Sequence, residues 1–408
     1  MPTISLNKKE VLKLSGVNLS DTELAEKIAL LGTDLEEITK DRINVEIFPN
    51  RPDLLSEQGF ARALSSFLGI NKGIIRYSKK KSSYKMIIDK SVKGVREYTA
   101  CAVVKGIDFT EERIDEIIQI QEKLHVTYGR QRKKAAIGIY PLDKITFPIT
   151  FKADKPENIV FTPLESNKKM NGAEILSSHA TGKEYGHLLK GMKKYPFFID
   201  SNYEILSMPP IINSNTTGRI TPSTKDVFIE CSGNDHAVLS RCLNMIITAL
   251  SDIGGSIYEI EVENRNNNTK KNMPELEPEQ ISIDQQYVNN RLGLNLGEKD
   301  IKRYLENMGY GYEKGRALVP CYRTDVLAPI DLVEDIAIAY GFDKFEPTIP
   351  KVATIAQEEP IEKFKDKIAQ ILVGHQLYEA HTYNISSSNS QTKKMNLAKM
   401  DLVKIDNS

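Results

Sequence analysis

The stretch at residues 195–213, YPFFIDSNYEILSMPPIIN, decides the fold of the middle of the chain. Its two apolar runs, FFID and EILSM, predict two strands, and Pro209 with Pro210 predicts a rigid corner after the second. Further runs of this kind, KMIID, TACAVVKGI, AAIGIY, FPITF and DVFIEC, lie between residues 84 and 263. The run HAVLSRCLNMIITALSDIGG predicts a buried helix that ends at Gly254. We therefore expect one mixed α/β domain in this region.

The segments on either side of this domain share a pattern. GVNLSDTELAEKIALLG at residues 16–32 and GLNLGEKDIKRYLENMG at residues 293–309 both begin with G-x-N-L and end with glycine. Each copy then reaches an Arg-x-Asp motif, at residues 51–53 in the first and 323–325 in the second. The pattern predicts two copies of one small helix-plus-strand module. The alternative is a pair of unrelated amphipathic helices with similar caps.

The remaining segments complete a multidomain α+β chain. The tract NRNNNTKKNMPELEPEQ is polar, contains two prolines and has no apolar period, which predicts a linker. The segment EKFKDKIAQILVGHQLYEAHTYNIS predicts a helix that leads into a strand. We expect an N-terminal module at 1–82, the mixed α/β domain at 83–263, the linker at 264–278, a second module at 279–350 and a final domain at 351–408.

Composition argues against several classes of protein. The 408 residues include 55 basic and 55 acidic side chains, so we do not expect a polyanion to coat the whole surface, although RNA could bind local patches. The four cysteines form no CxxC pair and are expected to be reduced thiols of a cytoplasmic protein. The most apolar run, LNMIITAL, is far shorter than the roughly 20 residues of a membrane span. No GxxxxGKS, GxxxxGKT or GxGxxG motif occurs, so ATP chemistry would belong to another chain.

Polar side chains near strand ends predict a pocket in the mixed α/β domain. The strand pattern VFIECSG contains Glu230, Cys231 and Ser232, and alternation along a strand places Cys231 on the opposite face, in the core. The segment YGRQRKKAAIGIY places four basic residues directly before a strand, namely Arg130, Arg132, Lys133 and Lys134. These features indicate a pocket with a basic rim. The alternative is a strand-end loop with a solvated run of charge.

A group of acidic residues lies in the second module. In APIDLVEDIAIAYGFD, the side chains of Asp331, Glu334 and Asp335 stand at i, i+3 and i+4 and share one helix face, and Asp325 lies just upstream. Four converging carboxylates repel one another unless a cation neutralises them, and Mg²⁺ prefers oxygen ligands. The alternative is that acids in the first turn complement the helix dipole.

Taken together, these motifs resemble the β subunit of phenylalanyl-tRNA synthetase of the archaeal and eukaryotic kind. Residues 84–263 are similar to its editing domain, NRPDLLSEQGFARAL to its first module, and YRTDVLAPIDLVEDIAIAYGFD to its B5-like module. The final segment resembles the start of an inactive, class II synthetase-like domain, most of which is absent. The resemblance implies editing residues at Phe198, Ser207, Glu230 and Ser232, and magnesium ligands at Asp325, Asp331, Glu334 and Asp335.

The resemblance implies proofreading of tyrosine. A hydrophobic pocket shaped for phenylalanine rejects an added hydroxyl by only about a hundredfold. A second pocket that hydrogen-bonds the phenol inverts the selection. In that pocket Glu230 would accept the phenolic proton, Ser207 and Ser232 would hold the ester or a water, and Phe198 would pack the ring. Archaeal members commonly have Asp and Thr in place of Glu230 and Ser232, and the family often has a His-Asp pair after AIGI, where this chain has Tyr140 and Pro141.

The resemblance also implies partners. In this family the β subunit pairs with a catalytic α subunit, usually as an α₂β₂ tetramer, and the α subunit uses ATP to activate phenylalanine and charge tRNA(Phe). The expected partners are therefore the α subunit and tRNA(Phe), with Mg²⁺ as cofactor and neither DNA nor a membrane. Two other functions stay open: a non-catalytic RNA-binding scaffold and a free-standing hydrolase that edits tRNA in trans.

Overall fold

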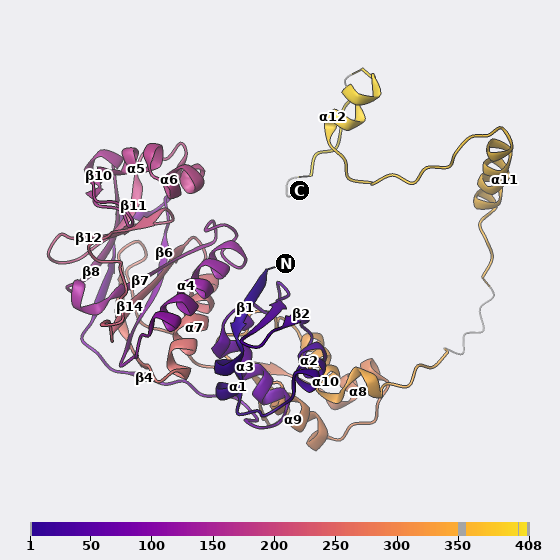
Figure 1. Cartoon of the computed structure of the whole chain (residues 1–408), viewed down its shortest axis with the longest axis horizontal. Helices are drawn as coiled ribbons and strands as arrows, with labels where there is room; N and C mark the ends of the chain where they lie inside the picture. Colours follow the sequence, from indigo (N-terminus) through magenta and orange to yellow (C-terminus); the bar gives the residue numbers. More distant parts are fainter. Residues whose placement is uncertain (1, 350–355, 399, 406–408) are drawn as a thin grey trace. The chain divides into compact units, whose positions relative to one another are not determined.

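The computed structural model describes residues 2–349, 356–398 and 400–405, in two units that span residues 1–345 and 346–408 (Figure 1). The first unit holds all the strands of the described chain, and the second holds α11 (Pro360–Gly374) and α12 (Ser388–Gln391). Within these described ranges, no helix combines the length and the apolar character that crossing a membrane requires.

The two predicted copies of the small module share one topology, which confirms the repeat. Each consists of strand, helix, helix, strand, strand and helix, and each forms an antiparallel sheet in which the last strand lies in the middle. The first copy comprises β1 (Thr3–Asn7), α1 (Lys8–Ser15), α2 (Asp21–Leu30), β2 (Asp34–Ile38), β3 (Arg42–Glu46) and α3 (Glu57–Phe67). The second comprises β18 (Glu279–Ser282), α8 (Gln285–Leu292), α9 (Glu298–Asn307), β19 (Gly311–Glu313), β20 (Arg316–Val319) and α10 (Pro329–Tyr340).

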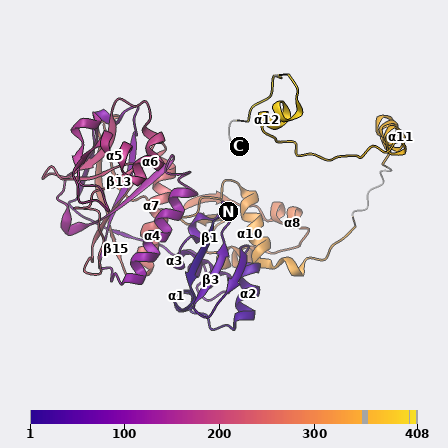
Figure 2. The ribbon, with the colours of Figure 1, turned by 45° about the horizontal axis from the view of Figure 1, so that its top comes forward.

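The shared sequence pattern explains the shared topology. The first helix of each copy ends at a glycine in the left-handed region, Gly16 at φ 71° and Gly293 at φ 68°, a conformation that glycine adopts without steric cost. The two copies lie side by side (Figures 1 and 2), and the N–H of Gly73 donates to the carbonyl oxygen of Glu306 at 2.8 Å. The modules therefore pack on each other as well as on the middle domain.

The middle domain contains two main sheets that face each other. The larger has seven strands in the order β13-β12-β11-β8-β5-β16-β17, and the smaller has five in the order β4-β15-β6-β14-β7. The larger sheet comprises β5 (Lys85–Ile88), β8 (Ile149–Asp154), β11 (Tyr195–Ile199), β12 (Ile205–Met208), β13 (Ile212–Asn213), β16 (Ile260–Asn264) and β17 (Thr269–Met273). The smaller comprises β4 (Lys79–Lys80), β6 (Tyr98–Lys105), β7 (Ala135–Pro141), β14 (Val227–Gly233) and β15 (Ser256–Tyr258). The other elements are α4 (Glu111–Val126), α5 (Gly172–Ser178), α6 (Ala180–Tyr185), α7 (His236–Asp252), β9 (Val160–Phe161) and β10 (Met170–Asn171).

Strand β14 shows why the candidate site lies between the sheets. Its side chains alternate, and Cys231 interacts with Cys242 of α7 on one face, so the prediction that Cys231 belongs to the core is confirmed. On the other face, the ring of Phe228 packs 5.5 Å from the ring of Phe147, next to the larger sheet. Glu230 is two residues further along β14 and therefore points toward the larger sheet as well.

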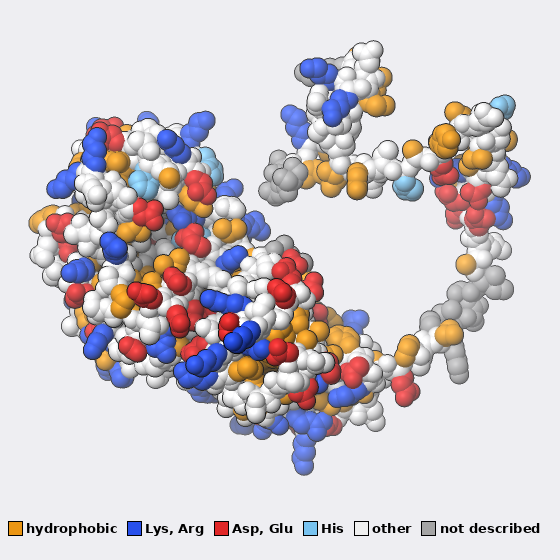
Figure 3. Space-filling model, viewed as in Figure 1, with side chains coloured by type: hydrophobic (Ala, Val, Ile, Leu, Met, Phe, Trp, Pro, Cys, Tyr) orange, Lys and Arg blue, Asp and Glu red, His pale blue; other side chains and the backbone are white. Residues whose placement is uncertain are grey.

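Two predictions about the ends of the domains need correction. The linker expected at residues 264–278 is not structureless, because Thr269–Met273 pairs with β16 as the edge strand of the larger sheet. A polar sequence suits an edge strand, since one side of it faces water. The helix predicted after residue 359 is present as α11, with its apolar side chains exposed (Figure 3), but residues 376–386 form no strand. Residues 351–355, at the start of the expected final domain, lie outside the described residues.

Candidate functional site

Glu230 is the centre of the candidate site. Its side chain is 1% exposed, and its Oε1 accepts a hydrogen bond from the Tyr140 hydroxyl at 3.1 Å. Its Oε2 is buried without a hydrogen-bond partner among the described residues. Burial raises the pKa of Glu230 to about 8, although Tyr140, the nearby Arg96 and the Ser232 hydroxyl act in the opposite direction. At neutral pH the carboxyl group is therefore mostly protonated and can donate a hydrogen bond as well as accept one.

Tyr140 connects Glu230 to Ser207 across the gap between the sheets. Its hydroxyl lies 2.8 Å from Oγ of Ser207 on β12, and both side chains are fully buried. Gly138, which is opposite Glu230 in the β7–β14 register, makes room for this contact. A Cβ atom at position 138 would lie 2.1 Å from the Tyr140 hydroxyl oxygen and 2.5 Å from Oε1 of Glu230, so a larger residue would break the arrangement.

The other two predicted editing residues have different surroundings. Arg96 donates from Nε to Oγ of Ser232 at 3.1 Å and also hydrogen-bonds the Ser232 carbonyl oxygen. The ring of Phe198 stacks on Phe151 with ring centroids 4.3 Å apart and is fully buried. The structure therefore joins Glu230 and Ser207 through Tyr140, places Ser232 beside Arg96, and places Phe198 in the core.

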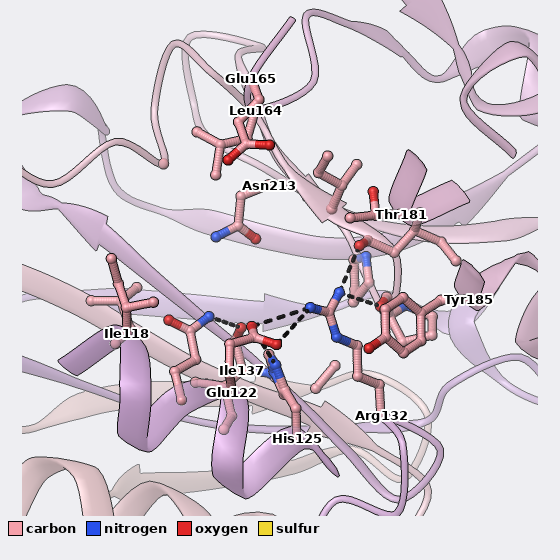
Figure 4. Close-up of a pocket in the computed structure, with 18 of the residues that line it drawn as sticks. Ile118, Glu122, His125, Arg132, Ile137, Leu164, Glu165, Thr181, Tyr185 and Asn213 are labelled. Carbon is pink, nitrogen blue, oxygen red and sulfur yellow. Dashed lines mark hydrogen bonds and ion pairs between the residues drawn. The ribbon is translucent and has the colours of Figure 1, made fainter. Parts of the chain in front are cut away.

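A cavity of about 850 Å³ opens next to Glu230. It is lined by α4, β7, α6, residues 164–165 and the segment that contains Pro209 and Pro210 (Figure 4). Of the four predicted editing residues, Glu230 lines this cavity, whereas Phe198, Ser207 and Ser232 do not. The predicted pocket is therefore present, and in this structure one of the four predicted editing residues reaches it.

In the basic loop at the edge of the cavity, residues 130–134, Arg132 points into the cavity and the other basic side chains face solvent. Three consecutive residues, Arg130, Gln131 and Arg132, have φ values of 47°, 54° and 63°. Such a conformation is unfavourable outside glycine and is characteristic of functional loops. Arg132 points into the cavity, donates to the Ile211 carbonyl oxygen at 2.9 Å and to Glu122 at 3.2 Å, and lies 4.1 Å from the ring centroid of Tyr185 (Figure 4).

The rest of that loop faces solvent. Arg130, Lys133 and Lys134 are exposed, as the predicted basic rim requires. His125, on the cavity wall, accepts from the Ile137 N–H at 2.8 Å through Nε2 and lies 3.1 Å from Glu122 through Nδ1. Burial lowers the pKa of His125, so the ring is neutral and donates from Nδ1. Both ring nitrogens are therefore engaged, and His125 is not available as a base.

Two of the four carboxylates predicted to bind magnesium, Asp325 and Asp335, converge on Arg323, and the other two lie elsewhere. Arg323 donates to Asp325 in a two-pronged pair at 2.8 and 2.7 Å, and also to Asp335 at 2.7 Å. Asp331 accepts from the backbone N–H groups of residues 327 and 328 at the start of its own helix, both at 2.8 Å, and Glu334 is exposed. Burial alone would raise the pKa of Asp325, but the Arg323 guanidinium outweighs it and holds that pKa below its usual range.

Arg323 therefore supplies the positive charge near Asp325 and Asp335. The spacing of the acidic residues in the sequence had suggested that a metal ion would supply it. Across the described part of the chain, no group of three or more His, Cys, Asp or Glu side chains could hold a metal ion. As arranged here, Asp325, Asp331, Glu334 and Asp335 do not fit a shared magnesium ion, and the predicted convergence of the four side chains is wrong.

Comparison with known proteins identifies the family. The family model described as "Phe-tRNA synthetase beta subunit B1 domain" matches residues 1–70. The family model described as "tRNA synthetase B5 domain" matches residues 281–342. The phenylalanine–tRNA ligase beta subunit of Pyrococcus horikoshii is 37% identical to this chain over 417 residues, which cover 100% of the chain and 74% of the relative. This chain belongs to the phenylalanine–tRNA ligase β subunit family. The family predicted from the motifs is confirmed.

Other β subunits show a similar relationship. That of Archaeoglobus fulgidus is 38% identical over 399 residues, which cover 97% of this chain and 72% of the relative. A crystal structure of an N-terminal fragment of the phenylalanyl-tRNA synthetase β subunit from Pyrococcus horikoshii matches with a TM-score of 0.78 and 36% identity, covering 83% of this chain and 99% of that one. The mixed α/β multidomain fold is therefore that of the amino-terminal part of this β subunit.

The sequence identified Tyr140 only as a departure from the family pattern. Two of its partners, Ser207 and Glu230, come 67 and 90 residues later in the chain, and no local pattern connects them. The available signal was the small residue two positions earlier, Gly138, which leaves space for a large side chain from the same face of the strand.

Proposed function

We propose that this chain is the β subunit of a phenylalanine–tRNA ligase and that the cavity beside Glu230 hydrolyses Tyr-tRNA(Phe). Family membership supports the ligase assignment. The observation that carries the editing assignment is a buried carboxyl group at the wall of the cavity, Glu230, whose Oε2 has no hydrogen-bond partner among the described residues. Buried polar groups without partners are rare in native proteins, and a ligand or a water usually explains them.

The chemistry of Glu230 suits the recognition of a phenol. A protonated carboxyl group can exchange hydrogen bonds with the hydroxyl of a bound tyrosine. A phenylalanine ring in the same place would leave the buried Oε2 unpaired, at a cost of roughly 1–3 kcal/mol. The cavity is within the usual volume range of small-molecule pockets. Selection at this site would therefore favour the ester that the synthetic site fails to reject.

The hydrolytic step needs only a positioned water. Water adds to the ester carbonyl carbon, the bond to the ribose oxygen breaks, and free tyrosine and uncharged tRNA leave. We assign no protein nucleophile, and His125 is not assigned as the general base because both of its ring nitrogens are already engaged. The exposed Arg130, Lys133 and Lys134 lie on the loop beside the cavity and would contact tRNA phosphates.

The proposal assigns the synthetic reaction to a partner. An α subunit would bind ATP and phenylalanine and charge tRNA(Phe), and the two subunits would assemble as α₂β₂. Magnesium would act with ATP in that partner, since Arg323 holds Asp325 and Asp335, and the backbone of its own helix holds Asp331.

Deacylation of Tyr-tRNA(Phe) tests the editing assignment. The purified chain, alone and with a co-expressed α subunit, is compared with Glu230→Ala and with Glu157→Ala, an exposed glutamate of the same domain. We expect hydrolysis above the spontaneous rate by the wild type and by Glu157→Ala, and a rate near background for Glu230→Ala. Spontaneous rates for all three proteins, with the α subunit present, would refute the assignment.

A further inference from the structure

The Tyr140 hydroxyl already contacts Glu230, which the editing proposal assigns to a substrate phenol, and Ser207, which was expected to hold the ester or a water. Its hydroxyl is 2.8 Å from Oγ of Ser207 and 3.1 Å from Oε1 of Glu230, and 3.5 Å from Oδ1 of Asn213. A tyrosyl ester that used the same pair would have to put its own hydroxyl in the same space. Two phenols cannot share that position.

We propose that Tyr140 is a resident phenol that sets the selectivity of this pocket between tyrosine and phenylalanine. This inference rests on the proposed editing function. With Tyr140 in place, Ser207 and Oε1 of Glu230 are occupied, and Oε2 of Glu230 is the carboxyl oxygen left without a hydrogen-bond partner among the described residues. The wild-type pocket therefore distinguishes the two amino acids less well than a pocket in which Glu230 and Ser207 are both free.

The packing around Tyr140 holds it in this position. The side chain is fully buried, and its ring stacks at 5.8 Å on Phe228, the neighbour of Glu230 on the same strand face. The space over Gly138 accepts the hydroxyl with no room for a second group. Burial raises the pKa of Tyr140 well above its usual value, and the Glu230 carboxyl raises it further, so the hydroxyl keeps its proton and stays a donor. The packing and hydrogen bonds therefore fix the Tyr140 hydroxyl between Ser207 and Glu230.

The location of Tyr140 explains why one predicted editing residue, Ser207, is hidden from the cavity. Ser207 does not line the cavity, and Tyr140 fills the gap between Ser207 and Glu230. Removing the Tyr140 side chain would join that gap to the cavity at Glu230. Ser207 and both oxygens of Glu230 would then face an incoming ring.

The expected change in the preference for tyrosine over phenylalanine follows from the hydrogen bonds that a bound tyrosine can make once the Tyr140 side chain is removed. A net contribution of about 1.4 kcal/mol per hydrogen bond corresponds to a factor of roughly ten in affinity. Sites built to hydrogen-bond a phenol can discriminate against phenylalanine by about 10⁵. We therefore expect the preference for tyrosine to be under about tenfold in the wild type and to rise at least about tenfold when Tyr140 is removed.

Binding of L-tyrosinamide and L-phenylalaninamide tests the inference without tRNA. Dissociation constants are measured for the wild type, Tyr140→Ala, Tyr140→Leu and the control Tyr203→Ala, which removes an exposed tyrosine of the same domain. Tyr140→Leu keeps apolar volume against Phe228 in case the alanine variant folds poorly. We expect a strong preference for tyrosinamide in the Tyr140 variants, a small one in the wild type and in Tyr203→Ala, and its loss when Glu230→Leu is added to Tyr140→Leu.

Deacylation of Tyr-tRNA(Phe) and Phe-tRNA(Phe) by the same proteins separates this inference from the proposed function. If the Tyr140 variants prefer tyrosinamide but no variant hydrolyses either ester, the resident phenol stands and the hydrolase assignment fails. If the wild type hydrolyses Tyr-tRNA(Phe) and Tyr140→Leu leaves the Tyr/Phe ratio unchanged, the function stands and the resident phenol is overturned. A Tyr140→Leu variant with no preference for tyrosinamide, including one that binds neither amide, also overturns it.

Discussion

Replacing Glu230 with glutamine should change how the stability of the protein depends on pH. The pKa of Glu230 rises from 4.5 to about 8 on folding, first because of burial. Between these values the unfolded chain loses the proton and the folded chain keeps it, so the stability contributed by the proton is complete below pH 4.5 and is lost as pH rises toward 8. At 1.36 kcal/mol per unit, the loss is about 2.5 kcal/mol between pH 5 and pH 7 and about 5 kcal/mol above pH 8.

Urea unfolding followed by circular dichroism measures this effect. Free energies of unfolding are determined for the wild type and Glu230→Gln at pH 5, 6, 7 and 8. Glutamine does not ionise, so the free energy of unfolding of the variant should increase steadily relative to that of the wild type as pH rises. The contributions of other titrating groups cancel in this difference. A difference that stays constant across this range would show that Glu230 ionises at its ordinary pKa, and the protonated carboxyl proposed for phenol recognition would be wrong.

Three further predictions concern the second module and the synthetic reaction. Arg323→Met should destabilise the protein by about 3–5 kcal/mol in urea unfolding, because it leaves Asp325 and Asp335 buried without their counter-charge. The control Arg303→Met removes an exposed pair with Asp300 and should lower the free energy of unfolding by under about 1 kcal/mol. Equal losses in the two variants would contradict the assigned role of Arg323. Thermal melts with magnesium and with chelator should superimpose, and a magnesium-dependent stabilisation that Glu334→Gln removes would contradict the structure. ATP–pyrophosphate exchange with phenylalanine should stay at background for the chain alone, and activity without an α subunit would refute the division of labour.

Local patterns in the sequence predicted much of the fold. The apolar runs of the middle domain became β5, β6, β7, β8, β11, β12 and β14, and the last helix of the domain became α7. The repeat was recognisable because its helix caps and its Arg-x-Asp motif depend on short-range geometry. The motif has the same paired contacts in both copies, with Arg51 donating to Asp53 at 2.9 Å and Arg323 donating to Asp325 at 2.8 Å.

The sequence was less informative wherever the outcome depended on distant contacts. The tract that contains Thr269–Met273 looked like a linker because its polarity is local, whereas its pairing with β16 depends on the sheet. Helical spacing placed Asp331 and Asp335 on one side of α10, but their partners decided their roles: the helix start for Asp331 and Arg323 for Asp335. In the same way, the partners of Tyr140 come from other strands and could not be read from its neighbours.

The most direct test of the account is the position of a bound phenol. A crystal structure of Tyr140→Leu with L-tyrosinamide would show it. We predict that the ligand hydroxyl lies within hydrogen-bonding distance of Oγ of Ser207 and Oε1 of Glu230, where the Tyr140 hydroxyl lies now. A ligand bound elsewhere in the cavity, with Glu230 and Ser207 making no contact to its hydroxyl, would contradict the assignment of this site to tyrosine recognition.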